Sequence, residues 1–168
     1  MYRILLILLA ITLVCSVAEA NTQQTIYAIC KQTIDIKFCS GILAKNQATS
    51  PIMKDFLKVT VTEAERISAN TYSFISTIFL NVGSGPGLQK CVESYARVNA
   101  SFTNAVSLFN EDRFAEIIGL MDEVSYGVGI CKTDFNVPGY NVNPMIAKNR
   151  ETNVLAAMEK IISHMVPS

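Results

Sequence analysis

The chain has 168 residues, of which 50% are hydrophobic, and its 14 basic and 14 acidic side chains leave no formal net charge. That length is enough for one domain with a buried core. Because no block of basic residues occurs, the chain lacks the electrostatic footprint of nucleic-acid-binding proteins, and we expect no nucleic-acid partner.

Residues 1–20 have the pattern of a secretory signal peptide. An early Arg3 precedes a nearly continuous apolar run over residues 4–15, and Ala18-Glu19-Ala20 supplies the small residues of a cleavage site. The run is too short to span a bilayer comfortably. We therefore expect cleavage directly after this tripeptide, secretion, and no membrane attachment of the mature domain over residues 21–168.

The mature chain keeps an even number of cysteines, which in a secreted protein indicates disulfide bonds rather than a metal site. They are Cys30, Cys39, Cys91 and Cys131. Four cysteines allow three pairings, so a further argument is needed to choose among them.

The first predicted unit is a small helical hairpin over residues 23–45, with its turn at Thr33 to Lys37. A Cys30–Cys39 bond would close a short loop across that turn. Apolar residues lie on one face of each half: Ile26, Ile29 and Cys30, then Phe38, Ile42 and Leu43.

A long helix is predicted next, from Pro51 to about Leu80, with Ser50 as its N-cap and Pro51 at its first position. The glycine-rich stretch over residues 82–87 ends it. Its predicted buried stripe consists of Met53, Leu57, Ala64, Ile67, Thr71, Phe74 and Ile78.

Two further amphipathic helices lie between Cys91 and Cys131, joined by the polar break Asn110-Glu111-Asp112. Either Asn110 or Asp112 could cap the second helix. Residues equally far from the turn of an antiparallel pair lie at the same height, and the two cysteines are nearly equally far from this break. The register therefore predicts a Cys91–Cys131 bond, which leaves Cys30 to pair with Cys39.

The second of these helices contains Gly119, Gly127 and Gly129. Each glycine costs up to about 1 kcal/mol against alanine in a helix interior, so the pattern predicts tight packing or an early fraying end.

The last predicted helix starts at Asn143-Pro144, after a loop, and ends before Val166-Pro167-Ser168. Four long helices with short connections, preceded by a hairpin, indicate an all-α fold with two disulfides. We expect an up-down-up-down four-helix bundle over residues 50–166. Its last helix turns inward the residues Ala147, Val154, Met158, Ile161 and Met165.

The sequence resembles the plant invertase and pectin methylesterase inhibitor family over about residues 23–166. The resemblance rests on Cys30-x8-Cys39 with Phe38, on Cys91 followed by Tyr95, on Cys131, and on the closing Ile161-Ile162-Ser163-His164-Met165-Val166-Pro167. It implies a four-helix bundle with an N-terminal hairpin and the two disulfide pairs predicted above. It also implies a plant source, a place in the apoplast, cell wall or vacuole, and an enzyme as target.

Two stretches bear on the target that the resemblance implies. Invertase inhibitors of the family insert a Pro-Lys-Phe motif, where this chain has Asp112-Arg113-Phe114. Methylesterase inhibitors usually have a Gly-Asp-Tyr-like stretch there and often close on Ser-Asn-x-x-Pro, which the stretch from Ser163 to Pro167 resembles. Lys132 departs from the acidic residue that many members have after the fourth cysteine.

Asp112, Arg113 and Phe114 are therefore candidate partner-binding residues, although Phe114 also fits the buried stripe of its helix. Asp112 would carry negative charge toward the catalytic carboxylates of an invertase. We accordingly prefer pectin methylesterase as the target and keep acid invertase as the alternative. Nearby acids form either a solvated helix face or contacts to a partner: Glu111, Asp112, Glu116, Asp122 and Glu123.

No catalytic residue, cofactor or metal site is predicted, and we expect no enzyme activity. His164 is the only histidine and lies in a terminal helical turn, where a basic side chain interacts favourably with the C-terminal end of the helix dipole. Asn99-Ala100-Ser101 makes Asn99 the candidate glycosylation site. A bundle that binds a small apolar ligand is the alternative from another class, with a pocket of Met53, Met121, Met158 and Met165, although core packing explains those methionines equally.

Overall fold

A computed structural model describes residues 20–45, 52–82, 85–133, 136–137 and 139–167. The predicted signal peptide, apart from Ala20, lies outside these residues, as do Ser50 and Pro51. The first described residue of the following helix is Met53, two positions after the predicted start.

All regular secondary structure in the described residues is helical, which confirms the all-α prediction. An N-terminal helix covers residues 20–30 of the described chain. The helices after it are α2 (Ile36–Lys45), α3 (Met53–Val82), α4 (Pro86–Asn110), α5 (Phe114–Ile130) and α6 (Met145–Met165).

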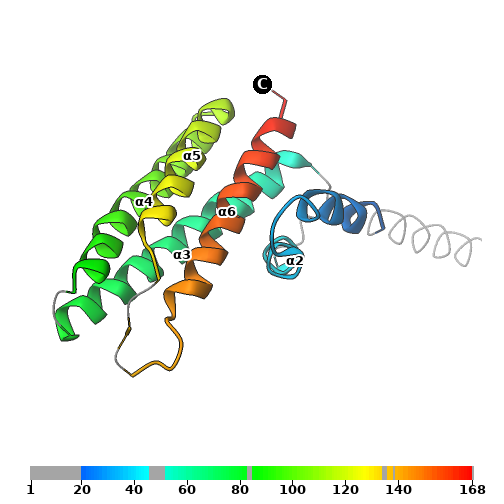
Figure 1. The fold of residues 1–168 in the computed structure, drawn as a ribbon. Helices are drawn as coiled ribbons and strands as arrows, with labels where there is room; N and C mark the ends of the chain where they lie inside the picture. The colour runs from blue at the N-terminus through cyan, green and yellow to red at the C-terminus, as the bar shows by residue number, and fades with distance from the viewer. Residues whose placement is uncertain (1–19, 46–51, 83–84, 134–135, 138, 168) are drawn as a thin grey trace, which may run out of the picture.

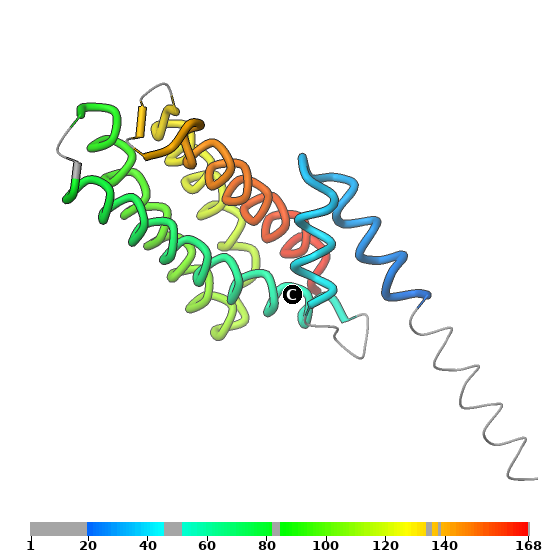
Figure 2. The backbone as a smooth tube through the Cα atoms, turned by 90° about the horizontal axis from the view of Figure 1, so that it is seen from below, coloured from blue at the N-terminus to red at the C-terminus, as the bar shows by residue number. Residues whose placement is uncertain are grey.

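Helices α3 to α6 form the predicted four-helix bundle, and the N-terminal hairpin lies against one end of it (Figure 1). Each helix packs on its neighbours in chain order, α3 on α4, α4 on α5 and α5 on α6, and the ring closes between α6 and α3. This is the up-down-up-down arrangement. Figure 2 shows α2 against the bundle beside α3 and α6, the two helices that it contacts.

The N-terminal hairpin turns at residues 31–35, slightly earlier than expected. The Asp35 side chain caps α2 by accepting a 3.0 Å hydrogen bond from the backbone N–H of Phe38. Phe38 lies three residues after Asp35, the usual spacing for an N-cap bond. A disulfide joins Cys30 to Cys39 across the turn, with the two Cα atoms 5.5 Å apart. Arg150 of α6 pairs with Asp35 at 3.2 Å and so ties the hairpin to the bundle.

The second disulfide confirms the register predicted for α4 and α5. Cys91 lies near the start of α4, Cys131 directly follows α5, and their Cα atoms are 4.2 Å apart. Both sulfur-bearing residues are buried. The bond therefore fixes the height of α5 against α4 at the end far from their connecting turn.

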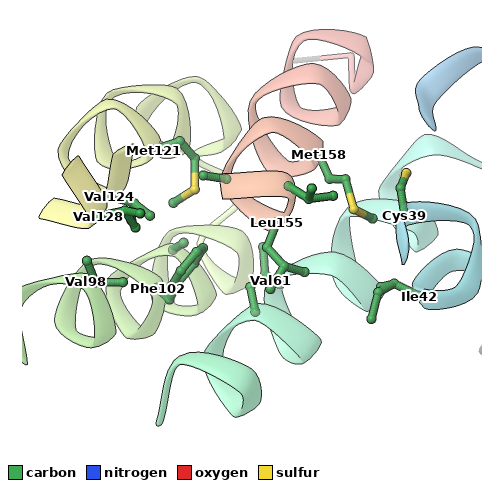
Figure 3. Packing of buried hydrophobic residues seen from close by; sticks show 14 of the residues in the cluster. Cys39, Ile42, Val61, Val98, Phe102, Met121, Val124, Val128, Leu155 and Met158 are labelled. Carbon is green, nitrogen blue, oxygen red and sulfur yellow. The ribbon is translucent and has the colours of Figure 1, made fainter. Parts of the chain in front are cut away.

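The core runs through the bundle and continues under α2. Val98 and Phe102 of α4 lie opposite Met121, Val124 and Val128 of α5 (Figure 3). On the side of α6 away from α5, Leu155 points toward Val61 of α3, and Met158 points toward α2, near Cys39 (Figure 3).

The buried face of α3 is rotated slightly from the predicted stripe. Leu57, Ala64 and Thr71 are buried as expected, but Met53, Ile67, Phe74 and Ile78 are only half-buried. The remaining buried positions of this helix were not predicted: Phe56, Thr60, Val61, Ser68 and Ile75. The helix is flanked by α4 and α6 together, so its buried face is wider than a single stripe.

The burial of the methionines agrees with core packing, the simpler of the two explanations given for them above. Met121 and Met158 are fully buried among core side chains, whereas Met165 is 43% exposed. Thioethers are flexible enough to fill irregular gaps between helices, which is their role in this core.

A polar network fastens α6 to the disulfide end of α4. The buried hydroxyl of Tyr95 donates to Asn149 Oδ1 at 2.8 Å and lies 3.2 Å from the Thr152 hydroxyl. The Asn149 amide in turn donates to the Cys131 carbonyl at 2.7 Å. Burial raises the pKa of Tyr95 to about 12, so the phenol stays neutral and keeps its donated bond.

We predict that the two disulfides contribute unequally to stability. Replacing both Cys91 and Cys131 by alanine should lower the free energy of unfolding by about 2–5 kcal/mol, because a bond over a long loop restricts the unfolded chain more. The sequence separation is 40 residues for this pair and 9 for the Cys30–Cys39 pair. Replacing Cys30 and Cys39 should therefore cost less, roughly 2.5 kcal/mol. Urea unfolding of both double variants measures this, and an equal or reversed order would contradict it.

Candidate functional site

The turn between α4 and α5 contains the predicted partner-binding residues, and its backbone closes α4 rather than opening α5. The N–H of Arg113 donates to the Leu108 carbonyl at 2.9 Å, and the N–H of Asp112 donates to the Phe109 carbonyl at 3.2 Å. With Asp112 at φ 58°, this is a Schellman motif. The left-handed residue that ends α4 is thus Asp112, at a position where glycine is usual.

The predicted caps of α5 were therefore wrong. Asn110 is the last residue of α4, and α5 begins at Phe114 after Arg113 with no side-chain cap. Capping chemistry alone did not distinguish a helix start from a helix end. Asp112 is a good capping residue, and it is also one of the few non-glycine residues that tolerate the left-handed region.

Arg113 and Asp112 both form ion pairs at the surface. The Arg113 guanidinium binds Glu116 through two bonds of 2.7 and 2.6 Å and Glu111 through a third of 2.6 Å. The bond from Arg113 lowers the pKa of the Glu116 carboxyl, and the two carboxylates raise the pKa of Arg113 above its usual range. Asp112 pairs with Lys54 of α3 at 2.5 Å. The guanidinium is thus already occupied by carboxylates of its own chain.

Phe114 is part of the core. Only 7% of its surface is exposed, and its ring lies 5.8 Å from that of Phe109, centroid to centroid. The Lys54 ammonium lies 5.5 Å from the centre of the Phe114 ring. The side chain therefore anchors the first turn of α5 to α4. That Asp112, Arg113 and Phe114 also bind a partner stays a prediction.

A groove of about 520 Å³ runs between α4 and α5 on the outside of the bundle. Its lining residues come from both helices: Lys90, Glu93, Ser94, Arg97 and Ser101 of α4, and Asp122, Glu123, Tyr126, Gly127 and Ile130 of α5. Asp122, Glu123, Gly127 and Ser101 were singled out from the sequence for other reasons, and the remaining lining residues were not predicted. Lys90, Glu93 and Arg97 are spaced three and four residues apart, and this spacing on one helix face was the available signal.

The two helices approach closely beside the groove. A β-carbon built on Gly127 would lie 2.8 Å from Val98 Cγ2, and the Ser94 hydroxyl donates to the Gly127 carbonyl. Of the two explanations predicted for the glycines of α5, tight packing applies at Gly127. Gly119 and Gly129 have no neighbour within 4 Å of such a β-carbon.

The side chains around the groove combine an exposed aromatic ring with charges of both signs. Tyr126 is 73% exposed. Asp122 pairs with Lys160 of α6 at 2.6 Å, and Glu123 accepts a long 3.4 Å bond from Ser101. Within the described chain, Lys90 and Arg97 form no hydrogen bond or ion pair, so both cations are available to a partner.

Asn99, the predicted glycosylation site, lies in the middle of α4 and is half-buried. Its Oδ1 accepts a 3.0 Å bond from Ser68 of α3. Ser101, the third residue of the sequon, is buried beneath the groove. In the folded chain the Asn99 side chain thus serves the α3–α4 contact, and its glycosylation stays a prediction.

A second groove of about 420 Å³ separates the N-terminal hairpin from the start of α6. Asp35, Phe38 and Arg150 line it together with the partly exposed apolar residues Val142 and Ile146. Neither groove contains a methionine, so neither is the apolar pocket considered above.

The described residues contain no group of three or more histidine, cysteine, aspartate or glutamate side chains placed to hold a metal ion. Among the same residues, no helix is both long enough and apolar enough to cross a membrane.

Comparison with known proteins gives a family and a fold. The model of the plant invertase/pectin methylesterase inhibitor family matches residues 24–166. A mutant form of a pectin methylesterase inhibitor from Arabidopsis superposes with a TM-score of 0.70 at 18% identity, covering 83% of this chain and 95% of that one. A pectin methylesterase inhibitor from Arabidopsis thaliana gives 0.62 at 18% identity, covering 85% and 96%. No curated protein matched the chain.

We predict that Asp112 carries a backbone cost that glycine would remove. Asp112→Gly should raise the free energy of unfolding by about 0.5–1 kcal/mol, because a non-glycine residue in the left-handed region is strained. Asp112→Pro should lower it by about 3 kcal/mol or more, since proline fixes φ near −65° and lacks the N–H of the turn. Thermal and urea unfolding measure both changes. A tolerated proline would contradict the assigned turn.

We predict opposite effects at two glycines of α5. Gly127→Ala should destabilise the protein by about 1–3 kcal/mol, because its methyl group overlaps Val98. Gly129→Ala is the matched control and should stabilise it by up to about 1 kcal/mol, since the site is open and alanine favours helix. Urea unfolding compares the two. Equal effects of both substitutions would show that the helices are not in close contact at Gly127.

Proposed function

Because the chain belongs to the plant invertase/pectin methylesterase inhibitor family, we propose that it is a secreted inhibitor of a pectin methylesterase. The family consists of protein inhibitors rather than enzymes, in agreement with the expected lack of catalytic residues. The signal-peptide pattern and the two disulfides support secretion to the apoplast or cell wall.

The observation that carries the choice of target is the φ of 58° at Asp112. This is the position where the invertase inhibitors have the proline of their Pro-Lys-Phe motif, and proline cannot adopt a positive φ. Glycine, which the methylesterase inhibitors usually have there, adopts it freely. The backbone of this turn is thus compatible with the glycine of the methylesterase-inhibitor pattern. It is incompatible with the proline of the invertase-inhibitor motif.

The side chains of the turn support the same choice. Phe114 is buried against Phe109, so inserting it into a target would remove it from the core. Arg113 would have to leave Glu111 and Glu116 in order to reach the carboxylates of an invertase. Glu111 and Glu116 belong to the same turn, so they would be brought unpaired toward a negatively charged pocket.

The α4–α5 groove is the docking surface in this proposal. Its exposed Tyr126 is the kind of rigid aromatic side chain that dominates protein interfaces. Lys90 and Arg97, which form no ion pair within the described chain, place two cations in the same groove. A bundle face laid across an enzyme cleft would bury roughly 1,600 Å² in total, the standard size of a specific interface. Substrate access would be blocked by this coverage, without any chemistry by the inhibitor.

Acid invertase is the second candidate target, and one observation favours it. Arg113 is half-exposed at the position of the lysine that the family's invertase inhibitors insert, and Phe114 is kept beside it. A forked guanidinium is well suited to carboxylates. Under this alternative Arg113 would dominate binding, whereas under the methylesterase proposal it would contribute little.

We predict that Tyr126→Ala weakens inhibition of pectin methylesterase by about 2 kcal/mol, roughly thirtyfold in Kd. Arg113→Ala should change the same Kd by less than about fivefold, as expected of an exposed ion pair. Tyr27→Ala is the matched control, because Tyr27 is an exposed tyrosine on the N-terminal helix. Titration of the purified mature protein and these variants against both enzymes at acidic pH gives the inhibition constants.

Inhibition of invertase alone, abolished by Arg113→Ala, would overturn the proposed target. Inhibition of the methylesterase that is unchanged by Tyr126→Ala would keep the target but exclude the groove as the docking surface. Circular dichroism of each variant controls for loss of the helical fold.

A further inference from the structure

Glu159 of α6 is a carboxylic acid inside the bundle with no polar partner. Its exposed fraction is 0%, and both of its side-chain oxygens are buried without a hydrogen bond. One helical turn further along, the buried Ser163 hydroxyl also has no partner. The two residues lie on the same face of α6, so the C-terminal half of this helix turns an unsatisfied polar cluster into the core.

No other buried charged side chain is present in the described part of the helices that pack on α6. Helix α6 packs on α2, α3 and α5, and Glu159 is the only buried side chain of a charged type among the described residues. The charged neighbours of Glu159 on its own helix, Lys160 and His164, are at the surface, and Lys160 binds Asp122 of α5.

Most buried hydroxyls of α3 are occupied, and the Ser76 hydroxyl is the one that lacks a partner among the described residues of this helix. Thr60 and Thr71 donate to backbone carbonyls of α3 itself, and Ser68 bonds to Glu65 and Asn99. The described residues therefore give Glu159 no counter-ion, and the two buried hydroxyls without a partner, those of Ser76 and Ser163, are not bonded to it.

The other end of α6 shows how this fold satisfies a polar core position. There Asn149 and Thr152 share bonds with Tyr95 and with the Cys131 carbonyl. Glu159 has no comparable set of partners, although a buried carboxyl group is costlier to leave without hydrogen bonds than a hydroxyl or an amide. An ionised carboxylate without partners is strongly unfavourable in an apolar interior, so the group keeps its proton instead. Burial raises the pKa of Glu159 well above the usual value for a glutamate.

We propose that Glu159 is a proton-linked switch that makes the bundle most stable in an acidic compartment and loosens the packing of α6 as the pH rises toward neutral. In acid the neutral carboxylic acid is tolerated in the core. At higher pH the carboxylate that forms gains solvation only if the C-terminal half of α6 moves away from α2, α3 and α5. Because the switch acts on the fold, it operates whichever enzyme the protein inhibits.

The sign of the pH dependence follows from linkage. In the unfolded chain a glutamate releases its proton near pH 4.3, whereas the folded chain holds the proton to higher pH. Between these two values the folded state binds more protons, so the free energy of unfolding falls as pH rises. The stabilising effect of the proton is complete below the unfolded pKa and is lost as pH increases through the folded pKa.

The test compares thermal unfolding of the wild-type protein, Glu159→Gln and Glu159→Met from about pH 4 to about pH 7.5. Over this range the wild-type Tm should fall by at least about 4 °C relative to both variants. Glutamine keeps the shape but cannot ionise, and methionine also removes the unsatisfied oxygens. Glu151→Gln, a half-buried glutamate of the same helix, is the matched control and should follow the wild type.

A wild-type curve parallel to that of Glu159→Gln would overturn the proposal. If neither Glu159 variant folds, infrared spectroscopy of the wild-type protein replaces the comparison. A carbonyl band of protonated carboxylic acid that persists at neutral pH, where exposed carboxyls are ionised, supports the switch. The absence of that band at neutral pH would overturn it.

Discussion

The Cys91–Cys131 bond holds α4 and α5 in the register on which the outer face of the bundle depends. It brings two Cα atoms to 4.2 Å at one end of the helix pair, while the turn at Asp112 closes the other. Between these fixed ends the helices must approach closely, and Gly127 is the residue whose missing side chain allows it. The α4–α5 groove and the placement of Tyr126 beside it follow from that approach.

The turn at Asp112 illustrates that retained side chains do not guarantee a retained geometry. Arg113 and Phe114 repeat the cation and the aromatic residue of a known inhibitory motif. In this fold, however, one is held by Glu111 and Glu116, and the other is packed on Phe109. The backbone conformation of the residue before them, which decides how a turn projects its side chains, is of the glycine type. Backbone geometry and side-chain similarity therefore suggest different partners, and the backbone sets which contacts are sterically possible.

Helix α6 combines two opposite treatments of buried polarity. The Tyr95, Asn149 and Thr152 network gives each of its members hydrogen-bond partners and rigidifies the disulfide end of the bundle. The Glu159 and Ser163 positions leave theirs unsatisfied near the hairpin end. Buried polar groups are thus satisfied unevenly along one helix, and the half with the unpaired groups is the one whose stability we propose to depend on a proton.

The sequence alone determined the helices, their order in the bundle and both disulfides, because hydrophobic periodicity and equal spacing from a turn are properties of the chain itself. It did not determine the conformation of Asp112, since a capping aspartate suits a helix start and a helix end alike. It also could not show that Gly127 is in close contact while Gly129 is open, or that Glu159 is buried without a partner. Only the tertiary structure decides these points, because each depends on what a neighbouring helix places opposite the residue.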